Sequence, residues 1–316
     1  MRQEAEIAKS ESPVSRAVFE RAIMETVLYS DCFDYPLTLP ELAHYLMGVE
    51  GCKEQIFEIL RRPSQLAGKL SLKDDYVTLR GREMLVERRR ARALKSRRIW
   101  KVARRYVRIL SALPFVRMVA VTGALAMDNC DERDDVDVLV ATTPSRVWLG
   151  RAFAVLVVRA GRLSRNTLCP NYVISQEALC LEPRSVYVAH EFAQMVSLYG
   201  KNLHAQMREA NPWVKNILPN ADKPFRQEAE CQPGPLVLAV KRAAERLLSG
   251  ALGTWLEGWE MRRKFRKFAA MTTDGTAGVR FDRDHVKGHF EDHGTRIAAE
   301  YRNRLRAHHL QFPDNV

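Results

Sequence analysis

The chain lacks any apolar run long enough to cross a membrane. Its longest uninterrupted apolar stretch, residues 152–158, is far below the roughly 20 residues that a spanning helix needs, and arginines lie on both sides of it. The first 15 residues are polar and charged, without the apolar core that a secretory signal requires. We therefore expect a cytoplasmic protein with no membrane partner.

Paired cysteines are also missing. The six cysteines are scattered through the chain without any C-x-x-C pair, which disfavours a zinc knuckle, a redox pair or a disulfide framework. Acidic residues are outnumbered by basic ones, which gives a formal net charge of +12. Such an excess attracts polyphosphates and nucleic acids, although charge alone supplies neither sequence specificity nor chemistry.

The length of 316 residues exceeds what a single hydrophobic core usually supports. Apolar periodicity and loop composition suggest an α+β protein with three regions, at 1–85, 86–182 and 183–316. We expect a winged helix in the first region, a mixed sheet with helices in the second and a helical third region.

The first region shows the pattern of a winged helix. Helical spacing of apolar residues predicts helices over 17–29, 39–46 and 53–61. Two short segments of alternating polarity, 69–72 and 76–79, then flank a polar turn and indicate a hairpin. A role as a transcription regulator is disfavoured because the helix over 53–61 carries Glu54 and Glu58, which would face phosphates.

No acidic residue occurs between positions 88 and 108, whereas eleven lysines and arginines do. Ile99, Ala103, Tyr106 and Val107 form an apolar stripe at helical spacing, so we expect a helix with one packed face and one positively charged face. The charged face fits contact with RNA or DNA, and it fits an ordinary solvated surface equally well.

Strands and then helices follow this basic segment. Strands are expected over 116–121, 136–141 and 171–175, with a helix over 146–163 between the last two. Helices are then predicted over 186–198, 203–210, 236–270 and 294–308. In the long 236–270 segment, Trp255 and Trp259 alternate with basic residues. That pattern is typical of a stacking surface for single-stranded nucleic acid, but more often of a helix with one core face.

The strongest functional motif is Thr122-Gly123-Ala124, followed after a polar loop by Asp135-Val136-Asp137-Val138. Alternate residues of a strand share a face, so Asp135 and Asp137 are expected to project together. Two carboxylates on one face can hold Mg²⁺, which prefers hard oxygen ligands and shares its shell with phosphates. The glycine turn lets a triphosphate approach main-chain N–H groups. The motif therefore predicts a nucleotide clamp, although a solvated strand edge gives the same acidic alternation.

These residues resemble the signature of the DNA polymerase beta-like nucleotidyltransferase superfamily, in which a strand ending in glycine precedes an Asp-x-Asp strand. The resemblance implies Mg²⁺-dependent transfer of a nucleotidyl group from a nucleoside triphosphate to an acceptor, which would be nucleic acid or protein. It implies catalytic, metal-binding roles for Asp135 and Asp137 and a phosphate-binding role for Gly123 and Ala124. Further segments resemble a little-characterised prokaryotic nucleotidyltransferase-domain family: Phe33-Asp-Tyr-Pro-Leu-Thr, Val121-Thr-Gly-Ala-Leu-Ala-Met, Leu168-Cys-Pro-Asn-Tyr and Asn211-Pro-Trp-Val.

Two departures from the superfamily pattern bear on activity. Ala124 stands where a serine or second glycine usually helps to hold the terminal phosphates. Active members also carry a third carboxylate on a later strand, where this chain has Asn171, with Glu177 and Glu182 only beyond it. The alternative is therefore a catalytically inactive nucleotidyltransferase fold that acts as a nucleic-acid-binding or regulatory protein.

Overall fold

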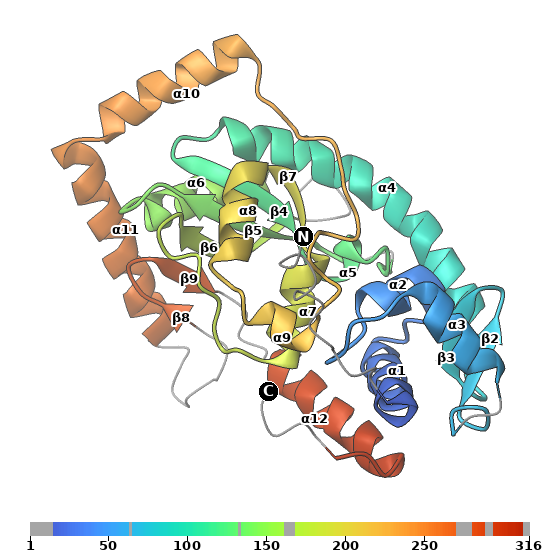
Figure 1. The fold of residues 1–316 in the computed structure, drawn as a ribbon. Coiled ribbons are helices and arrows are strands. Elements are labelled where there is room, and N and C mark those ends of the chain that lie inside the picture. Colours follow the sequence, from blue (N-terminus) through green and yellow to red (C-terminus); the bar gives the residue numbers. More distant parts are fainter. Residues whose placement is uncertain are drawn as a thin grey trace, which may run out of the picture.

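The computed structural model describes residues 15–62, 65–131, 134–160, 168–269, 280–287 and 293–311. The N-terminal segment in which no signal was expected lies outside these ranges, apart from Ser15. The chain has a mixed α+β fold with one three-stranded and one six-stranded sheet. Figure 1 shows the small sheet at one end of the molecule and the large sheet at its centre, with helices around it. None of the described helices is both long enough and apolar enough to cross a membrane.

The N-terminal part contains the three helices and the hairpin that its sequence predicts. Its elements are α1 (Arg16–Asp31), β1 (Leu37–Thr38), α2 (Leu39–His44), α3 (Lys53–Arg61), β2 (Leu70–Lys73) and β3 (Tyr76–Leu79). The strands pair antiparallel in the order β1-β3-β2. At the start of α2, Glu41 accepts a hydrogen bond of 2.8 Å from the Thr38 N–H, completing a capping box that fixes where this helix begins.

The six-stranded sheet has the order β7-β4-β5-β6-β9-β8. Its strands are β4 (Val116–Val121), β5 (Val136–Thr142), β6 (Leu168–Ser175), β7 (Val196–Tyr199), β8 (Arg280–Phe281) and β9 (His285–Lys287). Only β5 and β6 run parallel, and α6 (Val147–Ala160) forms the crossover that a parallel pair requires. The other neighbouring strands are antiparallel.

Two hydrophobic cores lie on opposite faces of this sheet. Along β5, Val136, Val138 and Val140 belong to one core, whereas Leu139 and Ala141 belong to the other, as strand alternation requires. The valine face packs against α4 (Leu85–Ala112) and α6, and α11 (Ala251–Ala269) packs on α6. The core on the other face includes residues of α1, α7 (Val186–Gln194) and α12 (His293–Ala307), and α12 packs against both α1 and α7. The remaining helices are α5 (Gly123–Ala126), α8 (Lys201–Glu209), α9 (Val214–Ile217) and α10 (Pro235–Leu248).

The region after residue 182 is less helical than the sequence predicts. The helix predicted over 186–198 is wrong beyond Gln194, because residues 196–199 form β7 and pair with β4. Val196 and Leu198 alternate into the core, a spacing of two that belongs to a strand. The helix predicted over 236–270 is interrupted after Leu248 and forms α10 and α11. Strands β8 and β9 were not predicted.

The tryptophans of α11 do not face a core. Trp255 is 59% exposed and Trp259 is 46% exposed, so the core-face interpretation is wrong for these two side chains. Further along α11, Phe265 contacts Trp148, with ring centroids 5.4 Å apart. The buried residues Gly253, Glu257, Glu260 and Lys264 recur at helical spacing, and Glu257 accepts hydrogen bonds from the Trp148 and Leu149 N–H groups of α6. This helix therefore packs along one side of its length, and the two tryptophans lie on its exposed side.

A buried ion pair connects α4 to the N-terminal part. The Arg89 guanidinium donates to Glu41 Oε1 and to the Pro36 carbonyl, each at 2.7 Å, and lies 3.6 Å from the centre of the Tyr35 ring. Both charged residues are less than 9% exposed. Because Glu41 also caps α2, Arg89 neutralises the carboxylate on which the start of that helix depends.

We expect Arg89→Ala to lower the free energy of unfolding by about 3–5 kcal/mol, because it leaves the Glu41 carboxylate buried and unpaired. Arg90→Ala is the matched control, since Arg90 pairs with Glu87 and Asp74 at the surface of the same helix. Such a pair contributes about 0–1 kcal/mol. Urea unfolding measures both, and equal losses would contradict the role given to Arg89.

Candidate functional site

The glycine turn and the second aspartate of the motif meet in space. The Thr122 N–H donates to the Asp137 carbonyl at 3.0 Å, which brings the end of β4 against β5. Gly123 has φ +64°, in the left-handed region that favours glycine. A Cβ at Gly123 would lie 3.0 Å from Asp137 Oδ2. The residue type at this turn is therefore set both by backbone conformation and by the space that the carboxylate occupies.

The two aspartates have different surroundings. Asp137 lies within β5, is half-buried and lines a cavity together with Gly123 and Ala124. Asp135 precedes β5, is exposed and does not line that cavity. The structure thus brings three of the four predicted site residues to one cavity and leaves Asp135 outside its wall.

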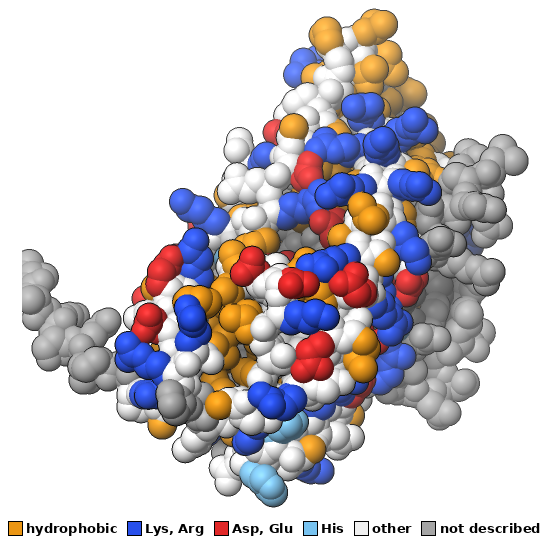
Figure 2. All heavy atoms as spheres, turned by 90° about the vertical axis from the view of Figure 1, so that its right-hand side faces the viewer, with side chains coloured by type: hydrophobic (Ala, Val, Ile, Leu, Met, Phe, Trp, Pro, Cys, Tyr) orange, Lys and Arg blue, Asp and Glu red, His pale blue; other side chains and the backbone are white. Residues whose placement is uncertain are grey.

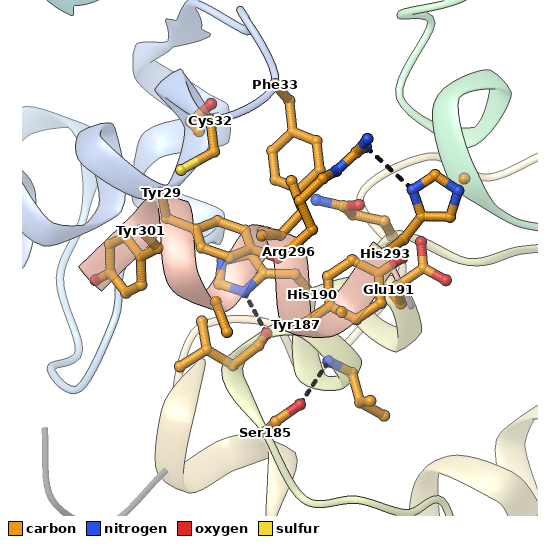
Figure 3. A pocket seen from close by; sticks show the side chains of 18 of the residues that line it. Tyr29, Cys32, Phe33, Ser185, Tyr187, His190, Glu191, His293, Arg296 and Tyr301 are labelled. Carbon is orange, nitrogen blue, oxygen red and sulfur yellow. Dashed lines mark hydrogen bonds between the residues drawn. The ribbon is translucent and has the colours of Figure 1, made fainter. Parts of the chain in front are cut away.

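The cavity, of about 710 Å³, lies on the sheet face opposite α4. Its walls come from α1, α5, β5, β6, α7, β9 and α12, which are far apart in sequence. Figure 3 shows Tyr29 and Tyr301 with His190 on one side of the cavity, and Tyr187 beside Glu191 and His293 on the other, with the Arg296 side chain extending past Phe33 toward His293. The cavity therefore has a wall suited to stacking against a planar group and an ionic end.

Asn171 reaches the cavity through an irregularity in β6. Val138 pairs with Pro170 and Leu139 pairs with Tyr172, so Asn171 is the extra residue of a β-bulge. Bulges redirect side chains and are common beside functional sites. The Asn171 Oδ1 atom is buried and accepts no hydrogen bond within the described part of the chain. An unsatisfied buried amide oxygen at the cavity wall is suited to a cation or to a donor on a ligand.

Neither of the acids considered as a third carboxylate lines the cavity. Glu177 and Glu182 are both exposed, beyond the end of β6. Within the described ranges no group of three or more histidine, cysteine or acidic side chains is placed to hold a metal. Mg²⁺ does not need such a group, because it retains several waters and shares phosphate oxygens. The Asp137 carboxylate and the Asn171 amide oxygen are hard oxygen ligands of the kind it uses.

The ionic end of the cavity is formed by α7, β9 and α12. Glu191 follows Tyr187 by one helical turn on α7, and Arg296 lies one turn after His293 on α12. The Arg296 Nη2 atom lies 3.1 Å from His293 Nδ1. Lys287 lines the same cavity from β9. Cationic groups that line the same cavity as the glycine turn suit a polyanionic ligand.

Under the aromatic wall lies His190, which is buried against Tyr29. Their ring centroids are 3.9 Å apart, and His190 Nδ1 lies 2.8 Å from the Val186 carbonyl. Burial lowers the pKa of His190 to about 4, although the backbone hydrogen bond opposes this shift. The imidazole is therefore neutral at pH 7 and acts as a packing group of the cavity wall.

The residues of α7 and α12 at the cavity were not identified from the sequence. Spacing of four places Tyr187 and Glu191 on one helix face, and spacing of three does the same for His293 and Arg296. That signal groups residues within a helix but does not reveal that the two helices converge. His285 lies in β9 and His293 begins α12, so these two histidines do not share a helix despite their spacing of eight residues.

No protein-family model matches the chain, and searches of curated proteins and of solved structures find no match. The superfamily resemblance therefore stays a prediction from the sequence motif.

Acid is expected to destabilise the protein partly through His190. Because its folded pKa lies below the unfolded value of about 6.5, the unfolded state binds more protons as pH falls from about 6.5 towards 4, so stability is lost over that window. Between pH 7 and 5 the loss from His190 is about 2 kcal/mol. We expect His190→Phe to reduce the acid-induced loss by that amount in urea unfolding. Exposed His309→Asn is the control, and an equal pH dependence in wild type and His190→Phe would refute this role.

Gly123→Ala is expected to cost more stability than strain alone explains. Gly81→Ala is the control, because Gly81 has φ +86° and open space where a Cβ would lie. Both changes carry about 1–2 kcal/mol of left-handed backbone strain. Only Gly123→Ala also presses on Asp137 Oδ2. Urea unfolding should show a larger loss for Gly123→Ala, and identical losses would mean that Asp137 tolerates the added methyl group.

Proposed function

We propose that the chain is a nucleotidyltransferase-fold protein that transfers a nucleotidyl group from a nucleoside triphosphate to an acceptor in a Mg²⁺-dependent reaction. The observation that carries this proposal is the contact between the Gly123 turn and Asp137 at the wall of a cavity large enough for a nucleotide. The buried, unsatisfied oxygen of Asn171 beside them adds a second polar group that points to a ligand.

In this proposal different residues bind different parts of the nucleotide. The turn at Gly123 and Ala124 receives the phosphates through main-chain N–H groups, and the base stacks on the aromatic wall. Asp137 and Asn171 would hold a magnesium ion, with Asp135 as a further carboxylate outside the cavity wall, and the ion would supply positive charge to the phosphates. An acceptor oxygen forms a bond to the α-phosphorus, the bond to the bridging oxygen breaks and pyrophosphate leaves. The acceptor proton is released to water.

The surrounding architecture has places for an acceptor in the same scheme. We propose that the three N-terminal helices and their hairpin form a winged helix, which suits contact with nucleic acid, although a protein acceptor fits the chemistry equally well. We also propose a cytoplasmic location, which the free thiols of the six cysteines support.

A second function is favoured by one specific observation. The wall residue contributed by β6 is an amide, and Glu177 and Glu182 do not reach the cavity. An amide cannot accept a proton from an attacking hydroxyl as a third carboxylate does. The alternative is an inactive nucleotidyltransferase fold that binds a nucleotide and acts as a regulatory or nucleic-acid-binding protein.

Incubation with nucleoside triphosphates labelled at the α-phosphate, with magnesium and RNA, DNA or the chain itself as acceptor, distinguishes the two. The transfer function predicts label in an acceptor and its loss, by at least a hundredfold, in Asp137→Asn, since the change removes a charged metal ligand. Glu177→Gln removes an acid outside the cavity and should transfer label as wild type does. Absence of transfer by wild type, or equal transfer by Asp137→Asn, would rule the enzyme out.

A further inference from the structure

One side of α4 carries five cationic side chains without an anionic partner. This basic row consists of Arg97, Arg98, Lys101, Arg105 and Arg108, all exposed and none in an ion pair within the described ranges. Other basic residues of the helix are neutralised, for example Arg88 by Asp34 at 2.8 Å and Arg92 by Asp131 at 2.8 Å. The excess positive charge of α4 is therefore concentrated between residues 97 and 108.

Helical geometry aligns these five side chains. At about 100° per residue they fall within a sector of roughly 100°, and their Cα atoms span about 16 Å along the axis. The apolar side of the same helix, with Ile99, Ala103 and Leu110, is buried in the core shared with β4. The helix is thus held rigidly by the sheet while its outer side displays a continuous row of one charge.

The distribution of charged side chains varies over this side of the molecule (Figure 2). Figure 2 views the molecule from the side of α2, α3 and the N-terminal half of α4, where red and blue side chains are interspersed. Toward the top of that view, lysine and arginine side chains gather with fewer acidic groups between them.

The basic row and the cavity lie on opposite faces of the sheet. Val119 and Val121 of β4 point into the core beneath α4, whereas Met118 and Ala120 point into the core on the cavity side. A ligand on α4 therefore does not occupy the cavity, and the two sites have no lining residue in common.

We infer that the basic row is a binding surface for a nucleic-acid backbone, separate from the nucleotide cavity. Four of its five cations are arginines, whose planar guanidinium groups pair with phosphates in bidentate geometry. A linear polymer with regularly spaced phosphates matches a rigid row of single-sign charge. A membrane surface is a poorer match, because a helix that lies on lipid needs a free apolar face and that of α4 is buried against the sheet.

This inference goes beyond nucleotidyl transfer and does not depend on it. It makes α4 an anchor that holds the protein on nucleic acid while the cavity remains open. Nucleic acid and nucleoside triphosphate should then bind together, and neither should displace the other.

The test compares two triple variants in full-length protein, using fluorescence anisotropy with duplex DNA and with single-stranded RNA. The row variant is Arg97→Gln/Lys101→Gln/Arg105→Gln. The control is Arg88→Gln/Arg90→Gln/Lys95→Gln, which removes equal charge from the same helix but at residues already paired. Circular dichroism melting confirms that both fold.

We expect the row variant to lose at least tenfold in affinity for nucleic acid. Each phosphate contact contributes about 0.9 to the slope of log affinity against log salt for duplex DNA, so its slope should be shallower by about two to three. The control should bind within about threefold of wild type, as should Asp137→Asn and wild type saturated with ATP and magnesium. The affinities of Asp137→Asn and of the ATP-saturated wild type for nucleic acid test the basic row independently of the transfer reaction.

Equal affinity and salt slope in the row variant and wild type would overturn the inference. So would displacement of the nucleic acid by ATP, since that places the polymer in the cavity. Binding of wild type to vesicles of anionic phospholipid without binding to DNA or RNA would likewise overturn it, in favour of a membrane surface.

Discussion

The geometry of the candidate site depends on the close approach of the Gly123 turn to Asp137. A glycine with positive φ leaves β4, and its backbone lies where a Cβ would be 3.0 Å from the Asp137 carboxylate. The hydrogen bond from the Thr122 N–H to the Asp137 carbonyl holds the end of β4 against β5 at this position. An open turn and a half-buried carboxylate are thereby held side by side without any contribution from a ligand.

The cavity is closed by segments from three parts of the sequence. The turn and Asp137 come from the central sheet, but the walls are completed by α1 from the N-terminal part and by α7 and α12. Tyr29 of α1 stacks on His190 of α7 and meets the Tyr301 ring of α12 edge-on, at 5.4 Å between centroids. Burial of these aromatic rings keeps helices from three parts of the sequence around one space, so the site is a product of tertiary packing.

The sequence correctly predicted the helices, strands and turns that are determined by neighbouring residues along the chain. Strands β4 and β5 form where their apolar segments predict them, α3 begins and ends where its sequence indicates, and the Gly123 turn follows from residue type. The failures have physical causes. Residues 196–199 continue an apolar run that is compatible with a helix. They form strand β7 instead, because they pair with β4. The bulge at Asn171 depends on the register between β5 and β6, which no single segment encodes. Asp135 lies two residues before Asp137, the spacing that places side chains on one face of a strand. It precedes β5, however, and does not line the cavity.

The number of basic residues in the sequence likewise differs from the number that remain unpaired and able to bind a ligand in the folded chain. Eleven basic residues on one helix look equivalent in the sequence. In the folded chain Arg89 is buried against Glu41, and the Arg92 guanidinium is paired with Asp131. Only tertiary contacts reveal which cations are left for a partner.

The most direct measurement is a crystal structure with a non-hydrolysable nucleoside triphosphate and Mn²⁺, whose anomalous signal locates the metal. The account predicts the phosphates at the Gly123 turn, with the metal bound by Asp137 and the Asn171 amide oxygen. A nucleotide bound elsewhere on the protein, or a metal that contacts neither side chain, would contradict it.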